Sequence, residues 1–237
     1  MNTAPPAKKS DLGVRTLSAI VMLAVAGGAL WLGGWFWTAF VALVAFGVWF
    51  EWSTLVLLFK PPGTGRMAWR LWGIVYCGAA AAMLIALRSP LNNIADGISA
   101  VLLVVGAVIA TDIGAYFAGR MIGGPKIAPS ISPSKTWAGL FGGAVGSGLS
   151  LVLLSSFSGN PAAVTILPAY LLAGAVIAII AQVGDFFESW MKRRAGVKDS
   201  GNLIPGHGGL FDRVDGLLAV CFVLGVLFMV SRLWGGM

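Results

Sequence analysis

The chain has 237 residues, of which 58% are hydrophobic and only 11% are charged, and its mean hydropathy is +0.88. Soluble domains carry about 25% charged residues, so this composition excludes an ordinary soluble protein. Several apolar runs reach the ~20 residues that a helix needs to cross a bilayer, and we therefore predict an all-α polytopic integral-membrane helix bundle. In such a chain the net charge of +7 is expected to set topology and to meet anionic lipid, with no role in binding nucleic acid.

Seven membrane spans are expected after a polar N-terminal tail over residues 1–13. They cover approximately residues 14–32, 35–58, 71–87, 97–118, 138–157, 164–187 and 214–233. We expect residues 14–237 to form one integral-membrane domain, with the candidate functional residues at about 97–237. Small residues recur at every fourth position of the fifth span, which favours close helix packing. They are Gly139, Gly143 and Ser147 in one row, and Gly142 and Gly146 in another.

The basic residues are distributed unequally between the two ends of these spans. If the N-terminus is cytoplasmic, 14 of the 16 Lys and Arg residues fall on the inner side, and only Arg88 and Arg232 fall outside. Short inner loops of membrane proteins carry such an excess of positive charge, which supports the span count and a cytoplasmic N-terminus. Eight of the nine acidic residues also lie toward the inner side, with Asp96 as the exception. Acidic residues do not follow this rule, so their position requires another cause.

Carboxylates end the sixth span and begin the seventh. Asp185, Glu188, Ser189 and Lys192 follow one another at i, i+3, i+4 and i+7, so a helix places them on one face. Such a face can hold a divalent cation through Asp185, because Mg²⁺ binds one or two carboxylates together with phosphate oxygens and water.

Two further acidic positions allow two interpretations each. Asp212 and Asp215 stand at i and i+3 in the first turn of the seventh span, where acids also serve as helix caps. Asp112 lies roughly 9 Å inside the inner end of the fourth span. There it is either a metal or substrate contact, or a carboxylate that is paired or reaches toward the surface.

Two loops are candidate anion sites. Gly206, His207, Gly208 and Gly209 form a flexible loop whose backbone N–H groups can approach an anion. His207 is the only histidine, and spacing alone does not choose between a loop hydrogen bond and a general acid or base. The loop from residue 119 to residue 137 brings hydroxyl groups and Lys135 to a helix start, which suits phosphate but also ordinary capping.

The segment from Ser189 to Asp215 resembles the signature of the phosphatidate cytidylyltransferases, also called CDP-diacylglycerol synthases. Every position of that pattern is filled here, by Ser189, Lys192, Arg193, Lys198, Asp199, Pro205, His207, Gly208, Gly209, Asp212, Arg213 and Asp215. The segments DIGAY at 112–116, SPSKT at 132–136 and QVGD at 182–185 are similar to family segments in the same order. Ile113 and Ala138 depart from the residues that are usual in the family.

The resemblance implies transfer of the cytidylyl group of CTP to phosphatidate, giving CDP-diacylglycerol and pyrophosphate, in phospholipid biosynthesis with Mg²⁺ as cofactor. It implies a catalytic set made of Asp185, Asp212, Asp215, Lys192, Lys198 and His207. It implies a substrate-binding set made of Ser134, Lys135, Ser189, Arg193, Asp199, Gly208, Gly209 and Arg213. The metal ligands would be Asp185, Asp212 and Asp215, joined by Asp112. It places the site at the cytoplasmic face of the inner membrane and leaves a homodimer open.

Two other classes of membrane protein share some of these features. A transporter also keeps ionisable residues in its spans, but near the midplane of the bilayer, whereas here they gather toward one surface. A CDP-alcohol phosphatidyltransferase requires an Asp-Gly-x-x-Ala-Arg motif, and the nearest match, which begins at Asp96, lacks the arginine.

Overall fold

The computed structural model of the chain describes residues 12–59, 65–89, 94–159 and 164–235. These residues form seven helices, and each is long and apolar enough to cross a membrane. The helices are α1 (Leu12–Leu32), α2 (Gly34–Leu58), α3 (Arg66–Leu87), α4 (Ile94–Met121), α5 (Trp137–Phe157), α6 (Leu167–Ala195) and α7 (Phe211–Gly235). The predicted all-α polytopic fold with seven spans is therefore confirmed. The predicted N-terminal tail lies outside the described residues, apart from positions 12 and 13.

The end of α6 differs most from the prediction. The sequence suggested an end at residue 187, but α6 continues to Ala195. Lys192, Arg193 and Arg194 occupy its last turn, where positive side chains interact favourably with the negative end of the helix dipole. Gly196 then ends the helix with a φ of 72°, a left-handed conformation that glycine adopts without steric cost. The longer helix carries Glu188, Ser189 and Lys192 on regular backbone, which fixes their positions relative to Asp185.

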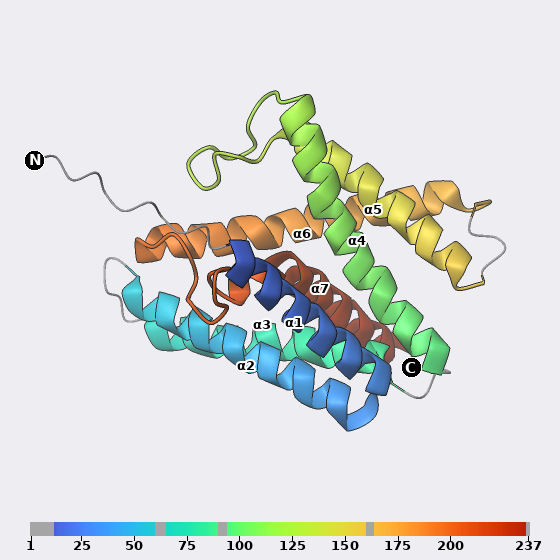
Figure 1. The fold of residues 1–237 in the computed structure, drawn as a ribbon, viewed down its shortest axis with the longest axis horizontal. Helices are drawn as coiled ribbons and strands as arrows, with labels where there is room; N and C mark the ends of the chain where they lie inside the picture. Colours follow the sequence, from blue (N-terminus) through green and yellow to red (C-terminus); the bar gives the residue numbers. More distant parts are fainter. Residues whose placement is uncertain (1–11, 60–64, 90–93, 160–163, 236–237) are drawn as a thin grey trace, which may run out of the picture.

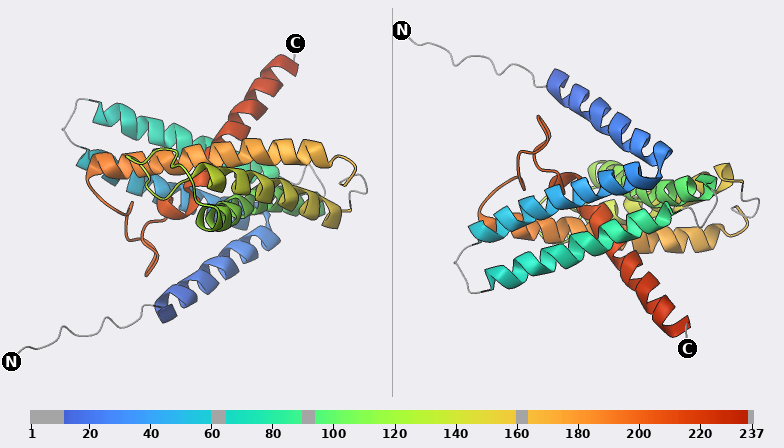
Figure 2. Two further views of the ribbon diagram at one scale, coloured as in Figure 1. Left: turned by 90° about the horizontal axis from the view of Figure 1, so that it is seen from above. Right: turned by 90° about the horizontal axis from the view of Figure 1, so that it is seen from below.

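α6 runs through the middle of the molecule, with α1, α2 and α3 on one side of it, and α4 and α5 cross α6 (Figure 1). Figure 2 shows that α1 and the C-terminal end of α7 project from the rest of the bundle in opposite directions. The C-terminal part of α4, the part of α6 near Asp185 and the first turns of α7 border one region, although they lie far apart in sequence.

The predicted small-residue packing of α5 is confirmed. A Cβ atom added to Gly142 would lie 2.7 Å from the carbonyl oxygen of Gly114 on α4, and one added to Gly146 would lie 2.7 Å from that of Ala110. On the other side of α5, a Cβ atom on Gly174 of α6 would lie 2.2 Å from the backbone nitrogen of Gly148. Only glycine allows these backbones to approach so closely, and α4, α5 and α6 therefore pack as one group.

The aromatic core lies on the opposite side of α6. Trp52 on α2 is fully buried, and its indole N–H donates to the carbonyl oxygen of Trp69 on α3 at 2.8 Å. The centroid of its ring lies 5.4 Å from that of Phe187 on α6 and 5.8 Å from that of Phe211 at the start of α7. These contacts tie the C-terminal ends of α2 and α6 to the N-terminal ends of α3 and α7. They place the first turn of α7 next to the last two turns of α6.

Candidate active site

The last turns of α6 and the first turns of α7 carry a group of three carboxylates. Oxygens of Asp185, Glu188 and Asp215, which we call the acidic triad, lie within 4.8 Å of one another. Gly184 makes this approach feasible, because a Cβ atom there would lie 2.7 Å from the carbonyl oxygen of Asp215. Three carboxylates at this spacing have the chemistry of a site for a hard divalent cation.

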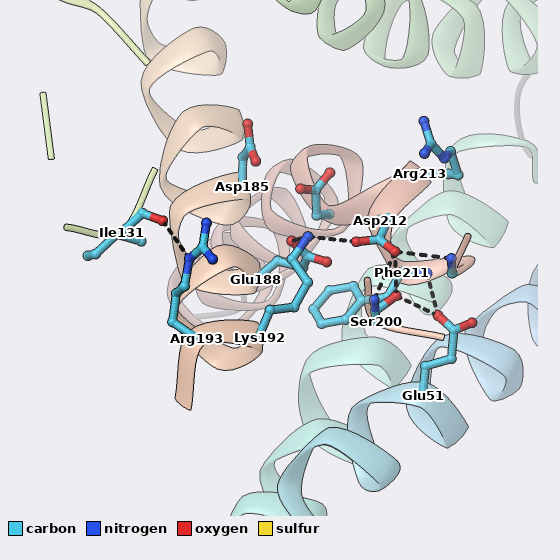
Figure 3. A network of polar contacts seen from close by, with 12 residues as sticks. Glu51, Ile131, Asp185, Glu188, Lys192, Arg193, Ser200, Phe211, Asp212 and Arg213 are labelled. Atoms are coloured by element: carbon cyan, nitrogen blue, oxygen red, sulfur yellow. Dashed lines mark hydrogen bonds and ion pairs between the residues drawn. The ribbon is translucent and has the colours of Figure 1, made fainter. Parts of the chain in front are cut away.

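Lys192 links this triad to Asp212. Its ammonium group lies 2.6 Å from Glu188 Oε2 and 2.6 Å from Asp212 Oδ1 (Figure 3). Glu188 is almost completely buried, and its second oxygen, Oε1, has no hydrogen-bond partner among the described residues. A buried carboxylate oxygen without a donor is energetically costly unless something binds it. Together with the spacing of the three acids, this oxygen without a donor fits a cation site at the triad.

Asp212 is held by the loop that precedes it. Its Oδ2 accepts hydrogen bonds from the backbone N–H of Ser200 at 2.9 Å, from the hydroxyl group of Ser200 at 3.0 Å and from the backbone N–H of Gly209 at 3.0 Å. Asp212 therefore orders the loop between α6 and α7, residues 196–210, in addition to meeting Lys192. Its oxygens are not among the three that lie closest together.

The loop between α4 and α5 brings Lys135 to the same place. Lys135 makes an ion pair with Asp185, while the hydroxyl group of the next residue, Thr136, accepts from the backbone N–H of Gly139 at 3.0 Å and caps α5. Thr136 therefore caps α5, while its neighbour Lys135 contacts the acidic site. The backbones of Lys126 and Thr136 form an isolated antiparallel β-bridge that closes the loop.

Two adjoining cavities meet at the acidic residues. The larger has a volume of about 590 Å³ and extends toward α4, where Asp112, Tyr116 and Arg120 line it. The smaller has a volume of about 390 Å³ and extends toward the α6–α7 loop. Ser134, Asp185, Asp212 and Asp215 line both cavities. Five of the predicted substrate-binding residues line the smaller cavity, namely Ser134, Ser189, Arg193, Asp199 and Arg213, and the predicted catalytic residues Lys192 and Lys198 line it too.

Three predicted residues lie outside both cavities. His207 Nδ1 is 2.9 Å from the hydroxyl oxygen of Ser18 on α1, and the carbonyl oxygen of His207 accepts from Arg213 Nη2 at 2.7 Å. Gly208 adopts a φ of 83°, and its carbonyl oxygen accepts from the backbone N–H of Ile204 at 3.0 Å. The N–H of Gly209 binds Asp212, so the anion that this glycine meets in the structure is a carboxylate of the chain itself.

Four residues that lie around the site were not predicted to belong to it. Tyr116, Arg120 and Gln182 line the larger cavity, and the Arg120 guanidinium donates to the Tyr116 hydroxyl oxygen at 3.2 Å. Helical spacing from Asp112 and Asp185 was the available signal for them. The fourth, Glu51 on α2, contacts the α6–α7 loop and the start of α7 (Figure 3). Its position near the end of an apolar span, and the resemblance of the Glu51–Trp52 pair to the family, were the available signals.

Seven apolar helices that gather buried carboxylates and cations around two joined cavities define a membrane protein with an ionic site. The chain belongs to the cytidylyltransferase family, whose pattern matches residues 54–231. It is thereby a nucleotidyltransferase enzyme, as the resemblance of residues 189–215 implied.

Relatives match over nearly the whole chain. A phosphatidate cytidylyltransferase of Brucella suis biovar 1 is 33% identical over 257 residues, covering 91% of this chain and 92% of the relative. A phosphatidate cytidylyltransferase of Rickettsia bellii is 34% identical over 232 residues, covering 96% and 94%. One of Haemophilus influenzae is 44% identical over 117 residues, covering 47% of this chain and 39% of the relative.

Proposed function

We propose that this protein transfers the cytidylyl group of CTP to phosphatidate, giving CDP-diacylglycerol and pyrophosphate. Family membership and the names of the relatives support this reaction. The observation that carries it is the meeting of two cavities at one group of carboxylates, with Lys135, Lys192 and Arg193 around them. A transferase that joins two phosphate-bearing substrates needs two such spaces with a shared wall.

The chemistry requires positioning and neutralisation of charge. An oxygen of the lipid phosphate attacks the α-phosphorus of CTP, a new P–O bond forms, and the bond to the β-phosphate breaks with release of pyrophosphate. No protein nucleophile is needed for this displacement, and such reactions depend mainly on alignment of the reactants and on cations at the developing charge. Lys192, Lys198 and Arg193 supply positive charge in the smaller cavity.

We assign the smaller cavity to the triphosphate of CTP and the larger to the phosphate group of the lipid. The smaller cavity carries Lys192, Arg193, Lys198 and Arg213, which matches the high charge of a triphosphate. The larger cavity has fewer cations, Arg120 and Lys135, and it lies between helices that are apolar on their outer faces. A lipid headgroup needs such a position next to the bilayer.

We also propose that Mg²⁺ is the cofactor. Asp185, Glu188 and Asp215 would hold it, because their oxygens lie close together and Glu188 Oε1 has no other partner among the described residues. When bound, Mg²⁺ would neutralise phosphate charge. Asp112 lines the larger cavity and Asp212 lines both, so each remains a proposed contributor at the edge of the triad. The site would face the cytoplasm at the inner membrane, where CTP is available.

The direct test measures incorporation of labelled CTP into lipid by the purified protein in mixed micelles, with and without added phosphatidate. We expect labelled CDP-diacylglycerol to form only when phosphatidate is present and to require Mg²⁺. A transporter would form no labelled lipid. Formation of labelled product from an alcohol and CDP-diacylglycerol, with no product from CTP, would favour a phosphatidyltransferase and contradict the proposal.

A further inference from the structure

Glu51 is a buried acid with an unusual set of partners. It lies on α2 with only 2% of its surface exposed, in a helix that otherwise buries apolar side chains and a serine. Its Oε1 accepts from the backbone N–H of Leu210 at 3.0 Å, and its Oε2 accepts from that of Phe211 at 2.8 Å. Both N–H groups belong to the start of α7, where a helix leaves its first amides without internal partners. Glu51 thus caps α7 from a helix about 160 residues earlier in the chain.

The same carboxylate is connected to the acidic site through Ser200. The hydroxyl group of Ser200 is 2.9 Å from Glu51 Oε2 and 3.0 Å from Asp212 Oδ2. Asp212 in turn meets Lys192, and Lys192 meets Glu188 of the acidic triad. A continuous series of polar contacts therefore runs from α2 to the end of α6, and Figure 3 shows it from Glu51 to Lys192.

The α6–α7 loop closes tightly over Glu51. A Cβ atom on Gly201 would lie 2.4 Å from Glu51 Oε1, so the loop can close over the carboxylate only with glycine there. No lysine or arginine of the described residues makes an ion pair with Glu51. The negative charge instead meets backbone N–H groups and the positive end of the α7 dipole, an arrangement that stabilises a carboxylate at a helix start.

We infer that Glu51 is a positioning residue of the active site, which sets the orientation of Asp212 and Lys192 by fixing the start of α7 and the α6–α7 loop. The inference concerns the part of the chain just before the family match, which begins at residue 54. It rests on the proposed function for its kinetic consequence, whereas its structural part stands on the contacts of Glu51 alone. Glu51 touches no residue of the acidic triad in these contacts, so it acts through Ser200 and Asp212.

The chemistry requires a carboxylate at this position. Two acceptor oxygens serve three donors, and glutamine would replace one oxygen with an NH₂ group that cannot accept a hydrogen bond. In either orientation of the amide, at least one backbone N–H at the start of α7 would face another donor. Glu51→Gln is therefore expected to loosen the loop and the first turn of α7 while leaving the volume of the side chain unchanged.

The first measurement is hydrogen exchange of the full-length protein in detergent, which does not depend on activity. In Glu51→Gln, peptides that contain residues 203–211 should exchange at least ~10-fold faster than in the unaltered protein. Ser53→Ala is the matched control, because Ser53 is also buried on α2 and its hydroxyl group has no hydrogen-bond partner among the described residues. Unchanged exchange in Glu51→Gln would overturn the inference, and so would equal acceleration in Ser53→Ala.

The second measurement is a double-variant cycle in the cytidylyl-transfer assay. Glu51→Gln should lower kcat ~10- to 100-fold, the scale of a small misplacement of catalytic groups. When Asp212→Asn is already present, Glu51→Gln should add less than ~2-fold, because residues that act through one another are non-additive. A role in stability alone would multiply the two losses and would overturn the inference.

Gly201→Ala gives an independent check, since its methyl group would displace Glu51 without removing any polar group. It should reproduce the exchange pattern and the kcat of Glu51→Gln, and normal values for both would contradict the positioning role. If the unaltered protein transfers no cytidylyl group, the proposed function fails. The exchange results then still decide whether Glu51 holds the start of α7.

Discussion

The ammonium group of Lys192 lies 2.6 Å from Asp212 Oδ1, and this contact joins the end of α6 to the start of α7. The two residues are 20 positions apart, and the α6–α7 loop between them folds back so that its own amides bind the other oxygen of Asp212. Asp212 is therefore both an organiser of the loop and one side of the ionic site. The metal-binding role that the sequence left as one alternative for Asp212 stays a prediction.

Substitution of Asp212 by asparagine separates these roles. Asparagine retains one acceptor oxygen for the amides of Ser200 and Gly209, and it removes the negative charge that faces Lys192. We expect Asp212→Asn to fold normally and to lose at least ~100-fold in rate, on the scale of one preorganised electrostatic contact. Cytidylyl transfer by variants matched for thermal stability measures this. Near-normal turnover would leave Asp212 with a structural role only.

Substitutions at the neighbouring residues Lys135 and Thr136 test substrate contact and helix capping separately. Lys135→Ala removes the partner of Asp185, so we expect a higher half-saturating CTP or phosphatidate concentration and a lower rate with little change in stability. Thr136→Ala removes the cap of α5 and should lower stability by about 1 kcal/mol. Steady-state kinetics and thermal unfolding of both variants test these two expectations. Normal kinetics in folded Lys135→Ala would remove this loop from the site.

The close packing of α4 against α5 predicts that alanine substitutions at two glycines differ in their effect on stability. A Cβ atom on Gly114 would lie 2.3 Å from the carbonyl oxygen of Gly142, whereas one on Gly78 of α3 would meet nothing within 4 Å among the described residues. Gly114→Ala should therefore destabilise the protein by about 1–3 kcal/mol, the cost of overpacking a close contact. Gly78→Ala, the control, should be neutral or slightly stabilising. Equal unfolding temperatures in detergent would contradict the packing argument.

Features with a local signal were accessible from the sequence. The apolar runs predicted the seven helices, and glycines spaced by four predicted the close packing of α5. Helical periodicity placed Asp185, Glu188, Ser189 and Lys192 together. Each depends on residues within one or two helical turns. The end of α6 was the exception, because a basic segment reads equally well as a loop or as a favourable helix terminus.

Features that depend on tertiary packing were not accessible. The contact of Glu51 with Phe211 spans 160 positions, and no periodicity relates the two residues. The direction of His207 toward Ser18 depends on where α1 lies, and the binding of the Gly209 amide to Asp212 depends on how the loop closes. Glycine and histidine in a loop indicate flexibility and polar chemistry, but they do not indicate which partner is met.

Membrane orientation is a separate prediction from the distribution of basic residues. Leu203 lies in the α6–α7 loop and Ser158 follows α5 at the opposite end of the bundle, and both are exposed. Cysteines introduced at these positions should label from opposite sides of the membrane, with Leu203→Cys protected from an impermeant reagent in intact cells. Gly201 in the same loop is unsuitable, because a side chain there would collide with Glu51. Labelling of Leu203→Cys from outside would refute the cytoplasmic site.

The acidic triad leads to the sharpest prediction, since its geometry adds Glu188 to the proposed metal ligands, which the sequence did not predict. Asp185→Asn, Glu188→Gln and Asp215→Asn each keep the shape of the side chain and remove one charge from oxygens that lie within 4.8 Å of one another. If these residues hold Mg²⁺, each variant should need a higher Mg²⁺ concentration for half-maximal rate. Each should also lose at least ~100-fold in rate at low Mg²⁺, as expected when a preorganised electrostatic contact is removed.

If the three acids serve only to join α6 to α7, loss of charge should relieve their mutual repulsion, and the variants should be as active as the unaltered protein or more stable. Asp96→Asn, at the opposite end of α4 from Asp112, controls for a general effect of removing one carboxylate. The readouts are the Mg²⁺ dependence of cytidylyl transfer and the shift in thermal unfolding that Mg²⁺ produces without substrate. An unaltered Mg²⁺ dependence in all three variants would reject the triad as the metal site. A loss confined to Glu188→Gln would instead assign the effect to its ion pair with Lys192.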